Sequence, residues 1–186
     1  MRILLALLLF PALAHAETAV GFRVGGYGFR EPGTDVGWQD CRMNGVGLFV
    51  DRALIPLISL EVGLDAYFAH QHDEAAEDEH SHAAMDRVST LLSAAGALRP
   101  FPGARVSPYV QLGVGVELTR VAVDTDEASY VLPLAFFGLG GDLRLGRARL
   151  GAVFRMHAMG HFDHTAELSV EPELAAQVQF YAAVTL

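Results

Sequence analysis

Hydrophobic and polar residues alternate with a period of two along much of this chain. In residues 58–68, apolar side chains alternate with polar, aromatic or glycine positions, among them Glu61 and Asp65. Residues 110–119 and 174–186 repeat the pattern. Because successive side chains of a strand point to opposite faces, each of these segments is predicted to be a β-strand with one apolar face and one polar or small face.

Five further segments show a weaker alternation and bring the predicted number of strands to about eight, the smallest usual size for a closed membrane barrel. Many of them are long enough for the roughly 9–11 tilted residues with which a barrel strand crosses a membrane. The sequence therefore predicts an all-β fold, a closed antiparallel up-and-down transmembrane β-barrel. The five segments are residues 19–30, 44–51, 88–98, 131–145 and 149–160.

The connections between the predicted strands alternate in length, and their charges alternate with them. Short connections carry Pro or Gly together with arginines, whereas long connections carry most of the acids. An up-and-down barrel has tight turns at one end and long loops at the other, so basic and acidic residues are predicted at opposite ends, with both termini at the turn end in the periplasm. The arginines assigned to tight turns are Arg52, Arg99, Arg105, Arg147 and Arg149, and the long connections are residues 31–43, 70–87, 122–130 and 161–172.

The first sixteen residues, MRILLALLLFPALAHA, have the pattern of a secretory signal peptide. One Arg precedes an apolar run, and the small residues Ala14 and Ala16 favour cleavage before Glu17. The run is too short for a membrane-spanning helix, which needs about 20 residues. We therefore predict a signal peptide at 1–16 and a single exported domain at 17–186.

The composition is rich in apolar residues for an exported domain, with 52% hydrophobic residues and a mean hydropathy of +0.30. This surplus must face lipid or fill a large core; a soluble barrel with its apolar faces turned inward is the alternative fold. The formal net charge of −9 argues against a nucleic-acid partner, which requires a basic surface.

At the level of architecture, the chain resembles the small outer-membrane β-barrel proteins of Gram-negative bacteria, of the OmpA-like and OmpW-like kind. The resemblance rests on the signal peptide, the glycine-rich amphipathic strands, the alternating turns and loops, and a final strand that alternates through Val178 and Phe180. It implies an outer-membrane location, contact with outer-membrane lipid and recognition by the barrel-assembly machinery. Such proteins typically end in an aromatic residue, where this chain has Leu186. The resemblance implies no single activity, because the fold carries many functions.

If the apolar faces meet lipid, the polar faces point into the lumen and bring charged residues with them. Buried charges must be paired, so we expect ion pairs inside the barrel. An eight-stranded barrel is just wide enough for side chains to fill, which predicts a plugged lumen, with a narrow conduit for small solutes or ions as the alternative. Glycines on the strands are interpreted as making room for long side chains from the opposite wall. The predicted interior charges are Arg23, Glu61, Asp65, Glu117, Asp142, Arg144 and Arg155.

The segment HQHDEAAEDEHSH at residues 70–82 holds two His-x-His pairs around a run of acids. Imidazole suits Zn²⁺, Cu²⁺ and Ni²⁺, and carboxylates can supplement it, so His70, His72, His80 and His82 are candidate metal ligands. The alternative is a solvated outer loop, which is what charge runs usually are. No cofactor is certain from the sequence.

Three further histidines are predicted to join the same rim. His157, His161 and His164 lie near the loop end of the seventh predicted strand. A hydrolase would need a nucleophile positioned against one of them, but the neighbouring Ser169 has no spacing that ensures this. We therefore predict a non-enzymatic protein with a structural or surface-interaction role and an acidic, His-rich extracellular rim. A divalent-metal-binding surface protein and a narrow channel are the main alternatives, and a lipid-modifying enzyme is a further one.

Overall fold

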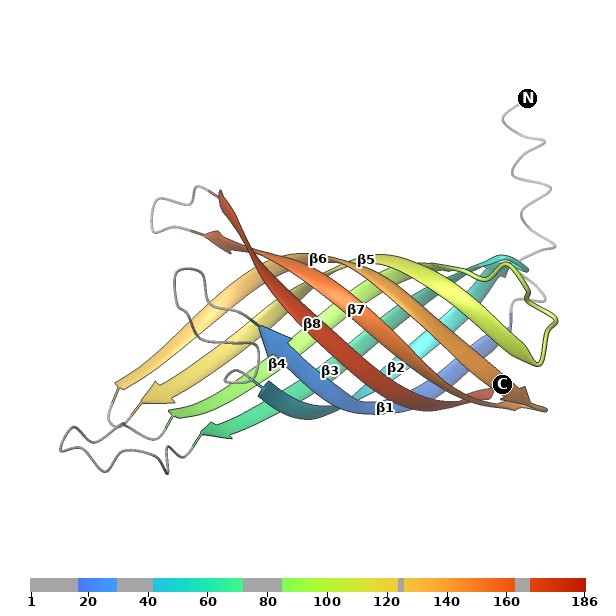
Figure 1. Cartoon of the computed structure of the whole chain (residues 1–186), viewed down its shortest axis with the longest axis horizontal. Helices are drawn as coiled ribbons and strands as arrows, with labels where there is room; N and C mark the ends of the chain where they lie inside the picture. Colours follow the sequence, from blue (N-terminus) through green and yellow to red (C-terminus); the bar gives the residue numbers. More distant parts are fainter. Residues whose placement is uncertain (1–16, 30–41, 72–84, 124–125, 163–167) are drawn as a thin grey trace.

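The computed structural model describes residues 17–29, 42–71, 85–123, 126–162 and 168–186 (Figure 1). Within these ranges every regular element is a strand, as the alternation predicted. The strands are β1 (Thr18–Phe29), β2 (Arg42–Ile55), β3 (Ile58–Gln71), β4 (Met85–Leu98), β5 (Val106–Val123), β6 (Asp126–Leu145), β7 (Ala148–Phe162) and β8 (Leu168–Thr185).

The eight strands form one closed antiparallel barrel in chain order, which confirms the predicted fold class. Each strand pairs with the next, and β1 closes the barrel by pairing with β8, so that Ala19 lies opposite both Asp51 and Thr185. The start of β1 and the end of β8 therefore meet at the end that carries the short turns (Figure 1). In the described residues no helix is long and apolar enough to cross a membrane.

Several strands are longer than the alternation predicted, and β2 shows why. It runs from Arg42 to Ile55, whereas the prediction ended at residue 51. Arg52 and Ala53 continue the pairing with β3 even though the apolar alternation stops there. Ladder hydrogen bonds join backbone groups and do not require alternating side chains, so the predicted turn at 52–56 shrinks to residues 56 and 57.

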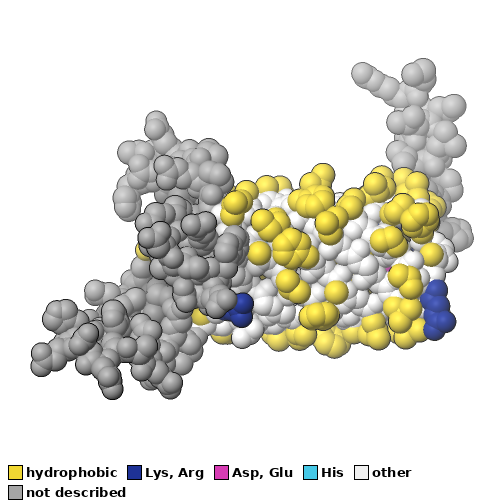
Figure 2. Space-filling view, viewed as in Figure 1, with side chains coloured by type: hydrophobic (Ala, Val, Ile, Leu, Met, Phe, Trp, Pro, Cys, Tyr) yellow, Lys and Arg dark blue, Asp and Glu magenta, His cyan; other side chains and the backbone are white. Residues whose placement is uncertain are grey.

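The outer surface of the barrel is apolar. Leu48, Leu64 and Leu92 lie side by side on β2, β3 and β4 and are 65%, 51% and 55% exposed. Apolar side chains like these are spread over the wall between the two ends (Figure 2). Polar side chains point inward instead, which is the reverse of a soluble barrel and the arrangement of a barrel that faces lipid.

Glycines make room for large side chains, but mostly for those of the adjacent strand. Tyr109 pairs in register with Gly140, and a Cβ at Gly140 would lie 2.6 Å from the tyrosine hydroxyl oxygen. The expectation that glycines accommodate side chains from the opposite wall is therefore largely wrong. A ring that folds over its glycine neighbour keeps close to the wall and leaves the lumen axis to other groups. The same arrangement occurs at Tyr181–Gly151, Phe49–Gly21, Tyr67–Gly45 and Phe136–Gly113.

Candidate functional site

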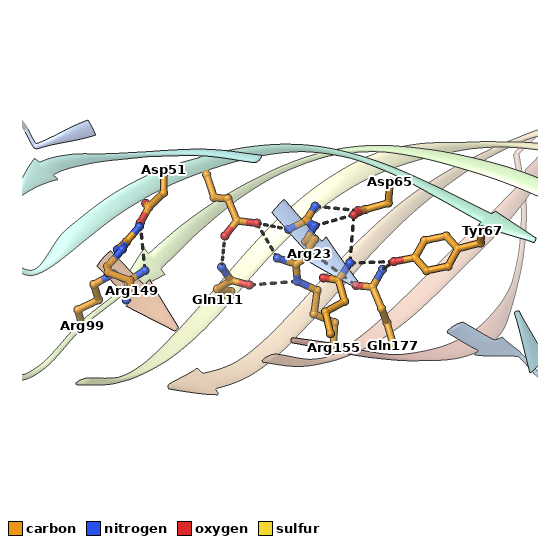
Figure 3. Close-up of polar contacts among 11 residues, drawn as sticks. Arg23, Asp51, Asp65, Tyr67, Arg99, Gln111, Arg149, Arg155 and Gln177 are labelled. Carbon is orange, nitrogen blue, oxygen red and sulfur yellow. Dashed lines mark hydrogen bonds and ion pairs between the residues drawn. The ribbon is translucent and has the colours of Figure 1, made fainter. Parts of the chain in front are cut away.

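Four charged residues meet in the middle of the lumen and form what we call the central charge cluster: Arg23, Glu61, Asp65 and Arg155 (Figure 3). Arg23 donates from Nε and Nη2 to the two carboxylate oxygens of Asp65, at 2.6 and 2.7 Å. Its Nη1 donates to Oε1 of Glu61 at 2.6 Å, and Nη2 of Arg155 donates to the same oxygen at 2.6 Å. The two positive and two negative charges therefore neutralise one another.

Side-chain amide groups form further hydrogen bonds with the central charge cluster. Gln111 of β5 donates to Glu61 at 3.0 Å and accepts from Nε of Arg155 at 3.1 Å. Gln179 of β8 donates to Asp65 at 3.1 Å. Buried charges are stable only when they are paired and hydrogen-bonded in this way. The Tyr67 hydroxyl accepts further hydrogen bonds from Gln177 and Gln179.

This network closes the barrel at its middle. The side chains of the central charge cluster come from β1, β3 and β7, so they reach across the lumen and do not line one side of it. Each of the four residues is at most 7% exposed. In this part of the barrel, side chains fill the lumen as predicted. They can do so because the interior of an eight-stranded barrel is only about as wide as the side chains that line it.

A second group of charges lies at the turn end, and we call it the turn-end cluster: Asp51, Arg99, Asp142, Arg144 and Arg149. Arg149 and Arg99 both donate to Oδ2 of Asp51, at 2.8 and 3.2 Å. Arg99 also donates to Asp142, and Nε of Arg144 lies 3.7 Å from the other oxygen of that carboxylate. Three strands (β2, β6 and β7) and the β4–β5 turn are thereby linked across the barrel mouth.

Arg99 is the centre of the turn-end cluster. It follows the last residue of β4, lies 6% exposed, and places its guanidinium carbon 4.4 Å from the centroid of the Tyr109 ring. Burial disfavours its charge, but the carboxylates of Asp51 and Asp142 outweigh burial and raise the pKa of the guanidinium above its ordinary value. Arg99 is therefore a permanent positive charge inside the mouth.

All members of the turn-end cluster except Asp142 line a cavity that opens at the turn end, and we call this cavity the vestibule. Its volume is about 890 Å³. Arg99, Arg144 and Arg149 line it together with the hydroxyl-bearing Ser59. Apolar residues of the β2–β3 turn form another part of its wall: Leu54, Ile55, Pro56 and Ile58.

The half of the lumen nearer the long loops is mostly apolar, with one buried carboxylate. Glu117 accepts hydrogen bonds from the hydroxyls of Tyr27 and Thr119, at 2.7 and 2.6 Å, and lies 3.6 Å from Nη2 of Arg87. Packed side chains fill this half of the barrel too. The apolar set consists of Tyr27, Met43, Tyr67, Leu91, Ala95, Leu132, Leu134, Phe136, Met159 and Ala175.

His157 lies in this apolar half and not at the rim, so the prediction that it joins the loop histidines is wrong. Inward positions of β7 recur at every second residue, and Val153, Arg155, His157 and Met159 occupy them. The His157 ring is fully buried and stacks on Phe136, with centroids 5.2 Å apart. Neither ring nitrogen forms a hydrogen bond to a nucleophile or a carboxylate, so within the described residues His157 has no catalytic partner.

The other predicted interior charges have mixed positions. Glu117 and Asp142 are buried in the lumen, as are the members of the central charge cluster. Arg144 differs, because it lies one residue before the end of β6 and its side chain is 28% exposed at the mouth. Arg99 lies in the β4–β5 turn, as predicted, and Arg149 lies at the start of β7 instead of in the turn before it. The side chains of both are buried at the mouth.

Most candidate metal ligands lie outside the described residues: His72, His80, His82 and His164. The backbone places His70 near the end of β3, paired with Asp86, and His161 near the end of β7, paired with Ser169. In the part of the chain that the structure describes, no group of three or more His, Cys, Asp or Glu residues could hold a metal ion.

Sequence reasoning missed part of the lumen that the same period-two rule could have found. Extending the inward register of β4 from Ala95 and Ala97 by one step reaches Arg99. Extending that of β7 backwards from Arg155 by steps of two reaches Arg149. Both arginines were treated as turn residues because the neighbouring Pro and Gly marked the ends of the strands. The register continues past the point where the apolar alternation is lost.

No protein-family model matches the chain, and no curated protein matches it either. Several solved structures do match the chain. Neisserial surface protein A has a TM-score of 0.65 at 10% identity, over 92% of this chain and 99% of that one. Ail, the attachment invasion locus protein of Yersinia pestis, has 0.57 at 13%, over 92% and 97%. This chain has the fold of the small outer-membrane β-barrels. The N-terminal β-barrel domain of Pseudomonas aeruginosa OprF is also similar, with a TM-score of 0.52 at 12% identity, over 91% of this chain and 99% of that one.

Proposed function

We propose that this outer-membrane-type barrel is a non-enzymatic outer-membrane protein with a structural or surface-interaction role, exported by a signal peptide at 1–16 and assembled by the barrel-assembly machinery. The observation that carries the proposal is the central charge cluster. Arg23, Glu61, Asp65 and Arg155 fill the middle of the lumen, which favours contact with a partner at the two ends of the barrel over passage of solutes through it.

The similar solved proteins support this role at a coarse level. One is described as a surface protein and another as an attachment invasion locus protein. His157, which lies in the lumen, is not hydrogen-bonded to a nucleophile, which favours a binding role over catalysis. The apolar wall of Leu48, Leu64 and Leu92 supports contact with outer-membrane lipid.

A conductance measurement tests the closed lumen. The wild-type protein, purified and inserted into planar bilayers, is expected to give no steady current steps above those of the lipid alone. Migration on a detergent gel that changes on heating would show that the protein used is a folded barrel. Steady, reproducible steps from the folded wild type would contradict the proposal and favour the narrow channel.

A divalent-metal role at the outer rim is the second candidate. The observation in its favour is that β3 and β7 each carry a histidine, His70 and His161, to the end of the barrel where the long loops begin. Acidic and imidazole side chains together suit Zn²⁺, Cu²⁺ or Ni²⁺.

Titration calorimetry with Zn²⁺ and Ni²⁺ tests the metal candidate. The wild type in detergent micelles is expected to bind, and affinity should fall below about pH 6, where imidazole is protonated. A variant with His70, His72, His80 and His82 changed to Ala is expected to lose binding, whereas His157→Ala serves as the control because that ring is buried in the lumen. Equal binding by wild type and the fourfold variant would end the idea.

A further inference from the structure

The vestibule at the turn end has an unmatched positive charge among its described residues. In the turn-end cluster three guanidinium groups face two carboxylates, those of Asp51 and Asp142. Arg99 is hydrogen-bonded to both carboxylates, and Arg149 is hydrogen-bonded to that of Asp51. Arg144 has a single contact with a carboxylate, at 3.7 Å. An excess charge in a partly enclosed site attracts an anion more strongly than it would in open water.

Unused donors in the same place point to a ligand. The Nε atoms of Arg99, Arg144 and Arg149 are buried and form no hydrogen bond, and neither does the Ser59 hydroxyl. Arg99 and Arg149 are more than nine-tenths buried, and all four residues line the vestibule. Buried donors without an acceptor destabilise a protein, so several of them around one cavity mark a site where an oxyanion would be stabilised.

The ligand also has to donate. Oδ1 of Asp51, which lines the vestibule, is buried and accepts no hydrogen bond. A simple carboxylate could not satisfy this oxygen. A hydrogen phosphate group carries acceptor oxygens and a hydroxyl donor, and a phosphoethanolamine group carries a phosphate and an ammonium. Guanidinium groups match the geometry of phosphate oxygens well.

The shape and position of the vestibule fit such a group. Its volume of about 890 Å³ exceeds what a phosphate alone needs, and Leu54, Ile55 and Ile58 give part of its wall an apolar character. Three exposed charges also line it, those of Glu17, Arg147 and the carboxylate of Leu186. Because they are exposed, water and salt screen them more strongly than the excess positive charge of the turn-end cluster. The site is thus built for a charged group attached to a less polar body.

We propose that the vestibule binds a phosphate group, carried either by a small soluble phosphate or phosphomonoester or by the headgroup of a phospholipid. The guanidinium groups of Arg144, Arg149 and Arg99 hold its oxygens, Ser59 donates a further hydrogen bond, and Asp51 accepts from its donor. This site lies at the end opposite the long loops and is independent of any role that the loops have.

Amide NMR of the whole protein in maltoside micelles, which contain no phosphate, tests the proposal. Titration with inorganic phosphate is expected to give saturable shifts at Ser59, Gly146 and Arg147 that sodium chloride at equal ionic strength does not give. A second titration adds short-chain phosphatidylethanolamine to the micelles. Saturable shifts with inorganic phosphate would identify the ligand as a soluble phosphate. Saturable shifts with the lipid but not with inorganic phosphate would identify it as a phospholipid headgroup. Absence of saturable shifts with both ligands overturns the proposal.

Three variants sharpen the test. Arg144→Gln removes the unmatched charge from a side chain that is partly exposed, and it is expected to weaken binding about tenfold. Ser59→Ala removes one donor without changing charge and is expected to weaken binding a fewfold. Arg105→Gln is the matched control, because Arg105 is exposed at the same end but does not line the vestibule. Unchanged affinity in Arg144→Gln, or in Ser59→Ala should the first variant fail to fold, overturns the assignment.

Discussion

Replacing Arg23 by methionine is expected to destabilise the barrel by about 3–5 kcal/mol, the range for removing one partner from a buried ion pair. Arg23 forms three charge-assisted hydrogen bonds, two to Asp65 and one to Glu61. The substitution keeps most of the side-chain volume but leaves the Asp65 carboxylate buried without a positive partner. Urea-induced unfolding in lipid vesicles, followed by tryptophan fluorescence or gel migration, would measure the change.

Double-mutant analysis separates the ion pair from the loss of packing. Arg23→Met combined with Asp65→Leu is expected to be more stable than Arg23→Met alone, because the uncompensated charge is removed as well. Arg52→Met serves as the control, since Arg52 is exposed on the outer face of β2 and its replacement should change stability by less than about 0.5 kcal/mol. Equal stability of Arg23→Met and Arg52→Met would mean that the central charge cluster does not hold the barrel together.

The sequence was sufficient to predict that Arg23, Glu61, Asp65 and Arg155 point into the barrel. Period-two alternation fixes which face of a strand each residue occupies, and the apolar surplus fixes which face meets lipid. Neither depends on the details of packing. The same logic gave the number of strands, because each strand of a membrane barrel must span a similar thickness.

Which charges pair with which could not be predicted. The height of a residue along the barrel axis depends on the register of all eight strands, and the pairing of Arg23 with Asp65 follows from the β1–β2 and β2–β3 registers together. Register is set by the backbone hydrogen-bond ladders and by the turns. The alternation of apolar and polar residues indicates which face of the strand a residue occupies, but not which residue of the next strand it pairs with. The vestibule was missed for a related reason, since Arg99 and Arg149 lie beside Pro and Gly residues that mark the ends of the predicted strands.

Replacing Leu64 by arginine is expected to destabilise the barrel by about 2–4 kcal/mol in lipid vesicles, the cost of a charge on the lipid-facing side of a barrel near the bilayer midplane. Leu64 is 51% exposed and lies between Leu48 and Leu92, so both cross-strand neighbours of the new side chain would be apolar. It faces away from Asp65, the next residue, whose inward position places it in the central charge cluster. The substitution therefore tests the environment of the outer wall without touching the lumen.

Phe101→Arg provides the matched control, because Phe101 is 60% exposed in the β4–β5 turn at the end of the barrel. A charge there reaches water and should cost less than about 1 kcal/mol. Urea unfolding of both variants in the same vesicles gives the comparison. A small and equal effect at the two positions would place the wall in water and contradict the membrane-spanning arrangement, whereas a depth-dependent cost follows only if hydrocarbon surrounds Leu64.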